Sequence, residues 1–289
     1  MGIVTDGTYV YWSGSDSAGK TFYVARRRVD QSDEVKMIAT AETRAEGLAL
    51  SSSKVFWLGD GHLRACDAPD CNNGPSDFEP TARNCFHVAS IATALFWSCQ
   101  TDYAKNNGSL WSVSNSGSTP VNLEPTSKNP TEFTSDGENI YWLNSTGFNS
   151  QNGLDAEGAV WRLELGTGAT TKLVSGLMQE MSQIAVGGGK LYFKEAEAEA
   201  IYAIPLPNGA LDPVKIADNR VGEMVADESD LYWADYYGGR ILRCSHAGCA
   251  TPEVIAPGQN LPNALAQDAV SIYWLGGNPG AAPVQRIAK

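Results

Sequence analysis

The sequence predicts an all-β fold, a seven-bladed β-propeller with four-stranded blades, on two observations. First, a short apolar and aromatic motif, as in "YVYW" and "DLYW", recurs along the 289 residues at the 40 to 51-residue spacing of four-stranded propeller blades. Its copies end at Trp12, Trp57, Trp97, Trp142, Phe193, Trp233 and Trp274. Second, glycine is frequent, with 29 residues, and apolar stretches long enough for a helix are few, which favours short strands joined by turns.

Each repeat supplies four strands in the same order. A short apolar strand and a tight turn, as in "FTSDGE" and "IAVGGG", precede the motif and form the inner strand. Asp-Gly and Gly-Gly provide the positive φ that such turns need. The aromatic motif is the second strand, a segment such as "VWRL" or "ILRC" is the third, and one such as "TTKLVSG" or "TPEVIAP" is the outer fourth.

These repeats predict one propeller domain over residues 1–289. The blades are expected at about 1–44, 45–84, 85–127, 128–178, 179–220, 221–259 and 260–289. The seventh repeat reaches only its third strand, so we expect either a three-stranded last blade or a missing strand that was lost with an upstream segment. A three-stranded blade has an open edge through which the chain is able to self-associate. Side chains alternate between the two faces of a strand, so the motif aromatics are expected to pack between blades rather than to bind a ligand.

Composition narrows the classes of partner. The formal net charge is −12 and the only basic run is Arg26-Arg27-Arg28, so the clustered cations of a nucleic-acid surface are missing. No run of 18 apolar residues predicts a membrane span. The chain begins inside the strand pattern, so the export signal that the cysteines imply is not expected in this sequence.

The six cysteines are spaced for local disulfides. Two C-x₄-C pairs start at the end of a third strand, and a further pair flanks a predicted hairpin centred near Ala92. The predicted disulfides are Cys66–Cys71, Cys85–Cys99 and Cys244–Cys249. They indicate an extracytoplasmic protein that is periplasmic, surface-anchored or secreted. Zinc binding that includes His246 and redox chemistry are the alternatives to structural disulfides.

One blade carries a family resemblance. The segment "DLYWADYYGGRILRC", which begins at Asp230, resembles the YWTD-type blade of low-density-lipoprotein-receptor propellers, with Ala234 in place of Thr. Residues 136–175 and 230–257 are more similar to secreted bacterial propellers of the myxobacterial type with VYW repeats, many of which are lipoproteins. The resemblance implies a propeller fold and an exported location, and says little about activity.

The main functional hypothesis is an exported, non-enzymatic binding or scaffold propeller. Two long polar loops, 98–109 and 143–158, follow the aromatic strands of blades three and four, and "ADYYGG" adds two tyrosines from blade six. Such loops on a rigid scaffold suit a protein, peptide or carbohydrate ligand, although ordinary solvated loops have the same composition. The candidate binding residues are Tyr103, Asn106, Phe148, Asn152, Asp155, Tyr236 and Tyr237.

The alternative is a metal-dependent lactonase-like or lyase-like enzyme with a site in the central channel, so catalysis is left open. His87, on a predicted inner strand, is the catalytic candidate, and a core or channel histidine is its other interpretation. No cofactor is predicted, but calcium is left open as a ligand, with Asp16, Asp60 and Asp235 as candidates; a calcium site needs six or more converging oxygens. No established catalytic or metal-binding motif occurs.

Overall fold

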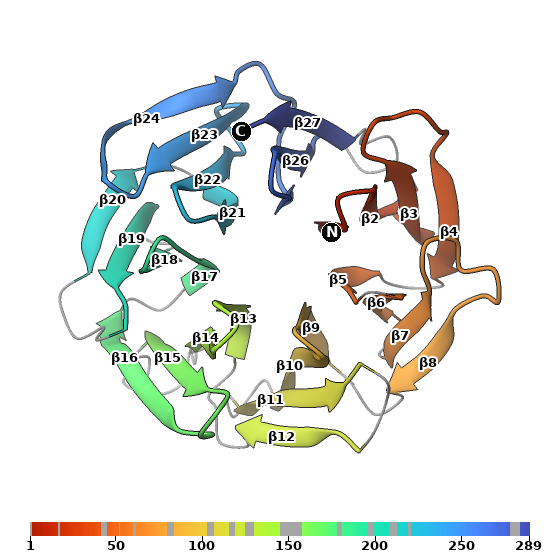
Figure 1. The fold of residues 1–289 in the computed structure, drawn as a ribbon, viewed down its shortest axis with the longest axis horizontal. Coiled ribbons are helices and arrows are strands. Elements are labelled where there is room, and N and C mark those ends of the chain that lie inside the picture. Colours follow the sequence, from red (N-terminus) through yellow and green to blue (C-terminus); the bar gives the residue numbers. More distant parts are fainter. Residues whose placement is uncertain are drawn as a thin grey trace. The chain divides into compact units, whose positions relative to one another are not determined.

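The fold is all-β and has seven antiparallel sheets. The computed structural model describes residues 2–16, 18–41, 45–51, 53–59, 62–79, 84–102, 107–115, 119–124, 130–144, 158–177, 181–195, 199–207, 213–218, 221–277 and 284–289. In these ranges every regular element is a strand, and six sheets have four strands while the last has three (Figure 1). The predicted seven-bladed propeller with a three-stranded last blade is confirmed. No helix in the described ranges is long and apolar enough to cross a membrane.

The strands follow the chain from inner to outer in each blade. Blade one has β1 (Ile3–Thr5), β2 (Tyr9–Ser15), β3 (Phe22–Arg28) and β4 (Lys36–Ala41); blade two has β5 (Glu46–Leu50), β6 (Lys54–Gly59), β7 (His62–Asp67) and β8 (Ser76–Glu79). Blade three has β9 (Cys85–Ile91), β10 (Ala94–Asp102), β11 (Asn107–Ser114) and β12 (Val121–Glu124); blade four has β13 (Pro130–Ser135), β14 (Asn139–Asn144), β15 (Gly158–Glu164) and β16 (Thr170–Leu177).

The remaining blades repeat this order. Blade five has β17 (Met181–Gly187), β18 (Lys190–Glu195), β19 (Ala200–Pro205) and β20 (Val214–Asp218); blade six has β21 (Val221–Ala226), β22 (Asp230–Asp235), β23 (Arg240–Ser245) and β24 (Gly248–Ala256). Blade seven has β25 (Leu265–Gln267), β26 (Ser271–Leu275) and β27 (Val284–Ala288). Within a blade, each strand after the first pairs antiparallel with the strand before it, so hairpin connections suffice for this order.

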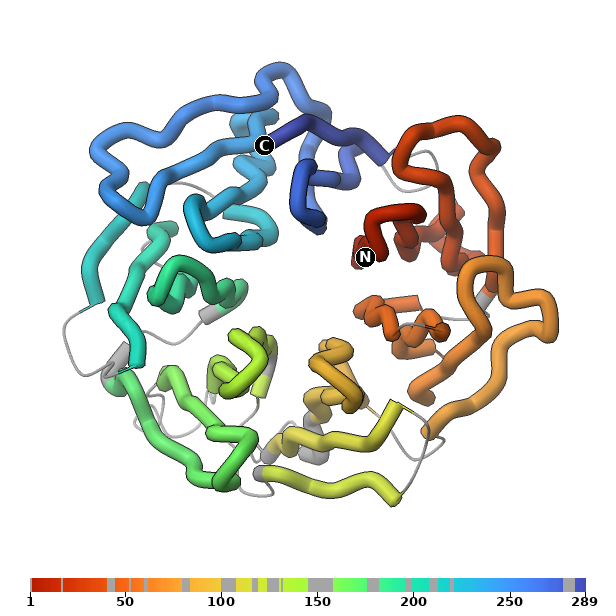
Figure 2. Tube along the Cα trace, in the orientation of Figure 1, coloured from red at the N-terminus to blue at the C-terminus, as the bar shows by residue number. Residues whose placement is uncertain are grey.

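The chain divides into two compact units. One comprises Met1–Trp97, Ser112–Val121 and Gln259–Lys289, and the other Ser98–Trp111 and Asn122–Gly258. In the first unit, inner strands β25, β1, β5 and β9 contact one another in that order (Figure 2). In the second unit, β13 contacts β17, and β17 contacts β21.

The motif aromatics form the core, as the alternation predicts. In strand β2, Tyr11 and Trp12 point to opposite faces of the sheet and are both buried. Tyr11 shares a core cluster with Trp57 of blade two, and Tyr192 of blade five shares one with Trp233 of blade six. The tyrosine of one blade therefore packs with the large aromatic of the next, which makes the motif a packing device between blades.

An aspartate in the turn after the inner strand fixes several of these tyrosines. Asp136 accepts hydrogen bonds from the backbone N–H of Glu138 (3.0 Å) and Asn139 (2.7 Å) and from the hydroxyl of Tyr141 (2.7 Å). Asp268 does the same for Tyr273 at 2.7 Å. Burial and the bond to Asp136 raise the pKa of Tyr141, so the hydroxyl stays a donor.

The cysteines are all in disulfides. Cys66–Cys71 and Cys244–Cys249 are bonded as predicted, with Cα atoms 5.1 and 5.3 Å apart. Cys85 and Cys99, the remaining two, are disulfide-bonded as well. The predicted structural disulfides are therefore confirmed, and these six cysteines are not free thiolates that could bind zinc. Disulfides are typical of an oxidising compartment.

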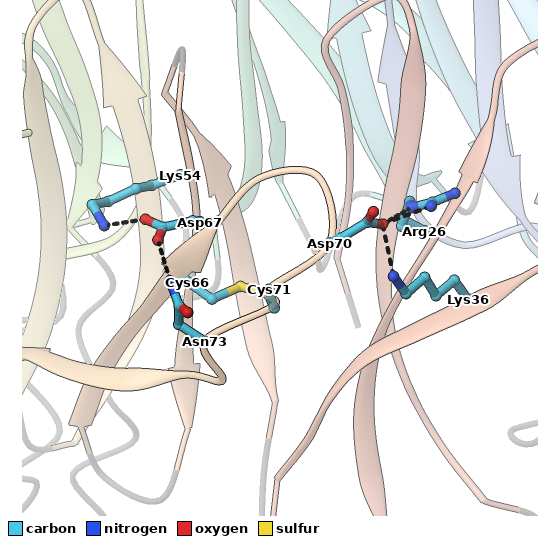
Figure 3. The surroundings of a disulfide bond; sticks show 8 residues. All are labelled: Arg26, Lys36, Lys54, Cys66, Asp67, Asp70, Cys71 and Asn73. Carbon is cyan, nitrogen blue, oxygen red and sulfur yellow. Dashed lines mark hydrogen bonds and ion pairs between the residues drawn. A yellow bond between two sulfur atoms is a disulfide. The ribbon is translucent and has the colours of Figure 1, made fainter.

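The disulfide loop of blade two makes ion pairs with blade one (Figure 3). The turn closed by Cys66–Cys71 carries Asp70, whose Oδ1 lies 2.6 Å from a guanidinium nitrogen of Arg26 and 3.0 Å from Nζ of Lys36. Arg26 is buried on β3 and also pairs with Asp33. The hydrogen bonds from Arg26 and Lys36 hold the pKa of Asp70 below its usual value.

The disulfide loop of blade six is bonded to blade five in a similar way. His246 lies between Cys244 and Cys249, and its Nδ1 accepts the hydroxyl of Tyr192 at 2.6 Å, which leaves Nε2 to donate to the Asp227 carbonyl oxygen at 2.8 Å. Nζ of Lys190 donates to the His246 carbonyl oxygen at 2.6 Å. Blade five has Gly187 where blades one, four, six and seven have the turn aspartate, and His246 serves as the partner of Tyr192.

We predict that Asp70→Asn destabilises the protein by about 1 to 2 kcal/mol at pH 7, because a charge-assisted bond between blades is lost. The folded-state pKa of Asp70 is depressed, so its contribution is present at neutral pH and is lost as the pH falls below about 4. Urea unfolding at pH 7 and pH 3 measures both effects. Asp67→Asn is the control, since the Asp67–Lys54 pair is exposed and is expected to contribute less to stability. Equal losses for the two variants would contradict the prediction.

Candidate functional site

One position of the inner strand is polar in four consecutive blades. It lies ten residues before the last residue of each aromatic motif, as Glu132 lies before Trp142. Its occupants are Gly2, Gly47, His87, Glu132, Gln183, Glu223 and Ala264. In blades two, four, five and six it falls inside a register shift between the first two strands. Because a bulge redirects a side chain away from the regular ladder, we call this the bulge position.

Blades four and five join their bulge positions by hydrogen bonds. Nε2 of Gln183 donates to Oε1 of Glu132 at 3.0 Å. The backbone N–H groups of Gln183 and Ile184 also donate to the Glu132 carboxyl. Gln183 has a φ of 69°, the left-handed conformation that places these two N–H groups beside the carboxyl. Glu223 occupies the same position on β21, the strand that packs against β17.

Burial gives Glu132 an unusual protonation. It raises the pKa of the carboxyl to about 7, although the hydrogen bonds from Gln183 and Ile184 oppose the rise. Near neutral pH the carboxyl is therefore divided between its acid and its carboxylate form. A group with such a pKa is able to donate or to accept a proton, and titrations shifted in this way are found disproportionately at functional sites.

Lys194 adds a cation at the same end of the second unit's blades. It follows the buried Phe193 on β18, and its Nζ donates to the carbonyl oxygen of Val221, the first residue of β21, at 2.8 Å. Burial lowers the pKa of Lys194, and the charge of Glu199 opposes this. At the blade ends that carry the turns after the second strands, β13 thus offers a carboxyl group (Glu132), β17 an amide (Gln183) and β18 an ammonium group (Lys194).

Tyr236 and Tyr237 form an aromatic pair on the turn after β22. Their ring centroids lie 5.0 Å apart at 84°, and Tyr237 is 69 % exposed. The turn is held by Asp235, which is 4 % exposed and accepts the N–H of Gly238 at 2.8 Å and Nε of Arg240 at 3.1 Å. Gly238 is required there, since a Cβ would overlap the Asp235 carboxylate.

His87 occupies the bulge position of β9, in the first unit. Burial lowers its pKa to about 4, so the imidazole is neutral at physiological pH and titrates well below the range in which histidine usually acts as an acid or base. Its two interpretations, as a catalytic residue and as a channel histidine, both stay predictions.

Two of the three metal candidates, Asp16 and Asp235, make local hydrogen bonds within turns. Asp16 caps a turn by accepting the backbone N–H of Lys20 at 2.8 Å, and this hydrogen bond lowers its pKa. Asp235 is bonded to Gly238 and Arg240, and Asp60 lies outside the described residues. Over the part of the chain that the structure describes, no group of three or more His, Cys, Asp or Glu is arranged to hold a metal ion. Calcium binding stays a prediction.

Most of the predicted loop site lies outside the described residues. This holds for Tyr103, Asn106, Phe148, Asn152 and Asp155. The blade-three loop was predicted at 98–109, but β10 continues to Asp102 and β11 begins at Asn107, so strands occupy most of it. Polar residues are compatible with this longer hairpin because backbone groups make the ladder hydrogen bonds.

Glu132, Gln183 and Glu223 were not among the residues predicted from the sequence. The signal that reveals them is the alignment of all seven repeats on their motif aromatic, which brings glycine, histidine, glutamate, glutamine and alanine into one column. A polar residue on an inner strand is otherwise indistinguishable from one on a solvated strand.

Structural comparison supports the fold. No protein-family model and no curated protein sequence matches the chain. A streptogramin B lyase is similar over 100% of this chain and 93% of its own, with 13% identity and a TM-score of 0.70. Virginiamycin B lyase from Staphylococcus aureus is similar over 99% and 93%, with 15% identity and a TM-score of 0.70. A nidogen/laminin complex chain is similar over 83% and 90%, with 13% identity and a TM-score of 0.58. At these identities the likeness shows the propeller fold alone.

Proposed function

We propose that this protein is an exported, non-enzymatic binding propeller that holds a protein, peptide or glycan ligand on the face bearing the turns after the second strands. The Tyr236–Tyr237 pair is the observation that carries the proposal. The exposed ring of Tyr237 and the half-buried ring of Tyr236 stand on a turn fixed by partly buried hydrogen bonds, and such rings provide contact area at a small cost in conformational entropy. The nidogen/laminin complex is an example of a similar fold that has a protein partner.

Export is part of the proposal and rests on the disulfides, which an oxidising compartment maintains. Membership of the secreted bacterial propellers with VYW repeats is proposed on the repeat pattern alone. Both are tested by locating the protein in fractionated cells of its source, where an intracellular, reduced protein would contradict them.

Replacing both tyrosines by alanine is expected to weaken ligand binding at least about tenfold, since central aromatic contacts commonly contribute 2 kcal/mol or more. Immobilised glycan and peptide libraries identify a ligand for the unaltered protein, and titration calorimetry then compares the variants. The matched control is Val270→Ala, which alters a residue 67 % exposed on the turn before β26, at the opposite end of a blade. The proposal fails if both variants bind equally, or if no ligand binds the unaltered protein.

Glu132 favours a second candidate function, a lyase-like or lactonase-like enzyme. Its carboxyl is hydrogen-bonded to Gln183 and lies near the blade ends that carry the turns after the second strands. With a pKa of about 7, it has the protonation needed for general acid–base catalysis at neutral pH. One similar structure is a catalytically inactive virginiamycin B lyase with quinupristin, so quinupristin is a direct probe. It is incubated with the protein, with and without added calcium, and followed by mass spectrometry. Turnover that Glu132→Gln abolishes supports the enzyme; no change in quinupristin or in a lactone panel contradicts it.

A further inference from the structure

Strand β27 is exposed where its counterparts are covered. In the other six sheets the third strand lies between the second and the fourth, whereas in the described chain β27 pairs only with β26. Ile241 on β23 and Val284 on β27 are equivalent, since each is opposite the residue that follows the motif tryptophan of its blade. Ile241 is fully buried, while Val284 is only half-buried.

The edge of β27 is also regular. Register shifts interrupt the pairing of the third and fourth strands in blades one, two, four, five and six. Such irregularities help to protect an outer edge from pairing with another chain. The pairing of β26 with β27 has no register shift from Val284 to Ala288. Of these edges, β27 is the one best prepared to accept another strand.

Alternation identifies the backbone groups that a new strand would meet. The N–H of Lys289 donates to the carbonyl oxygen of Val270 at 3.0 Å, so Lys289 faces β26. In an antiparallel ladder successive residues face opposite neighbours. The N–H and C=O groups of Val284, Arg286 and Ala288 therefore point outward.

The charge at the centre of β27 indicates which residue a strand docked beside it would carry. Arg286 is opposite Tyr273, as Arg243 is opposite Tyr232 in blade six. Arg243 is in turn opposite Glu253 of β24, and their side chains pair at 2.6 Å. Arg286 is exposed, and its guanidinium donates to the carbonyl oxygen of Val29. A glutamate on a strand beside β27 would complete the arrangement seen between β23 and β24.

We propose that β27 is a docking edge for an extended strand of a partner protein, with an acidic residue opposite Arg286 and an apolar residue following it. This proposal uses neither tyrosine of the proposed function. Self-pairing of two β27 strands centred on Arg286 would place two guanidinium groups opposite each other, and like charges in that position are destabilising. The partner strand is therefore favoured over a second copy of this chain.

The probe is a labelled synthetic peptide with the sequence of residues 250–257, which contains Glu253 and Val254 of β24. We expect it to bind the full chain and to slow amide exchange of Val284, Arg286 and Ala288, measured by nuclear magnetic resonance. A peptide with lysine in place of the glutamate is expected to bind about fivefold more weakly. The Arg286→Glu variant is expected to reverse this preference, which a loss of folding would not do.

Arg28→Glu is the matched control, because Arg28 is an exposed arginine on a third strand that has its fourth strand; it is expected to leave both peptide affinities unchanged. The proposal is overturned by the absence of binding at millimolar peptide, by equal affinity for the two peptides, or by protection of amides other than those of β27. Protection of β27 that grows with protein concentration without peptide would assign the edge to a second copy and overturn the partner strand.

Discussion

Replacing Gly188 by alanine is expected to destabilise the protein by about 3 to 4 kcal/mol, which combines left-handed backbone strain with overpacking. Gly188 has a φ of 55°, and a Cβ there would overlap the His246 ring of the neighbouring blade. The ring has little freedom to move, because its two nitrogens are bonded to Tyr192 and to the Asp227 carbonyl oxygen. Urea unfolding followed by tryptophan fluorescence measures the loss.

Two further variants separate the causes. Gly189 has a φ of 70° and nothing near its absent Cβ, so Gly189→Ala reports backbone strain alone and is expected to cost about 1 to 2 kcal/mol. In a His246→Ala background, Gly188→Ala is expected to cost no more than this, since the ring is gone. If Gly188→Ala costs the same with and without His246, the contact between the disulfide loop and blade five does not determine the effect.

Glu132→Gln is expected to change how stability depends on pH. Burial raises the folded-state pKa of Glu132 from 4.5 to about 7, so the folded protein holds this proton more tightly than the unfolded chain. Stability is therefore lost as the pH rises from about 4.5 to 7. Glutamine stays neutral, so the variant is expected to exceed the unaltered protein by on the order of 1 to 3 kcal/mol at pH 8, at about 1.4 kcal/mol per pKa unit. At pH 4 the two are expected to be equal.

His87→Gln is the control with the opposite sign. Burial lowers the pKa of His87 to about 4, so the unaltered protein loses stability as the pH falls from 6.5 towards 4. His87→Gln removes that loss and leaves the loss at high pH in place. Denaturant midpoints from pH 4 to pH 8 distinguish the two variants. A Glu132→Gln profile parallel to that of the unaltered protein would show that the carboxyl titrates normally.

Local pattern was enough to predict the fold class and the disulfides. The spacing of the motif aromatics predicts seven blades, and the alternation of Tyr11 and Trp12 predicts that both faces of a sheet are buried, because side chains on a strand have a period of two. The pairs Cys66–Cys71 and Cys244–Cys249 are each closed within one turn. These features depend on residues close together in sequence.

The candidate site was decided by the tertiary structure. Glu132 and Gln183 are 51 residues apart, and a bulge in each inner strand brings them to one hydrogen bond. His246 replaces a turn aspartate across 54 residues, as the partner of Tyr192. Neither contact has a local signature, since each depends on how one blade is stacked on the next. The sequence by itself determined which strands form and how each blade folds. The half-buried environment of Glu132, which raises the pKa of its carboxyl, arose only when the blades packed together.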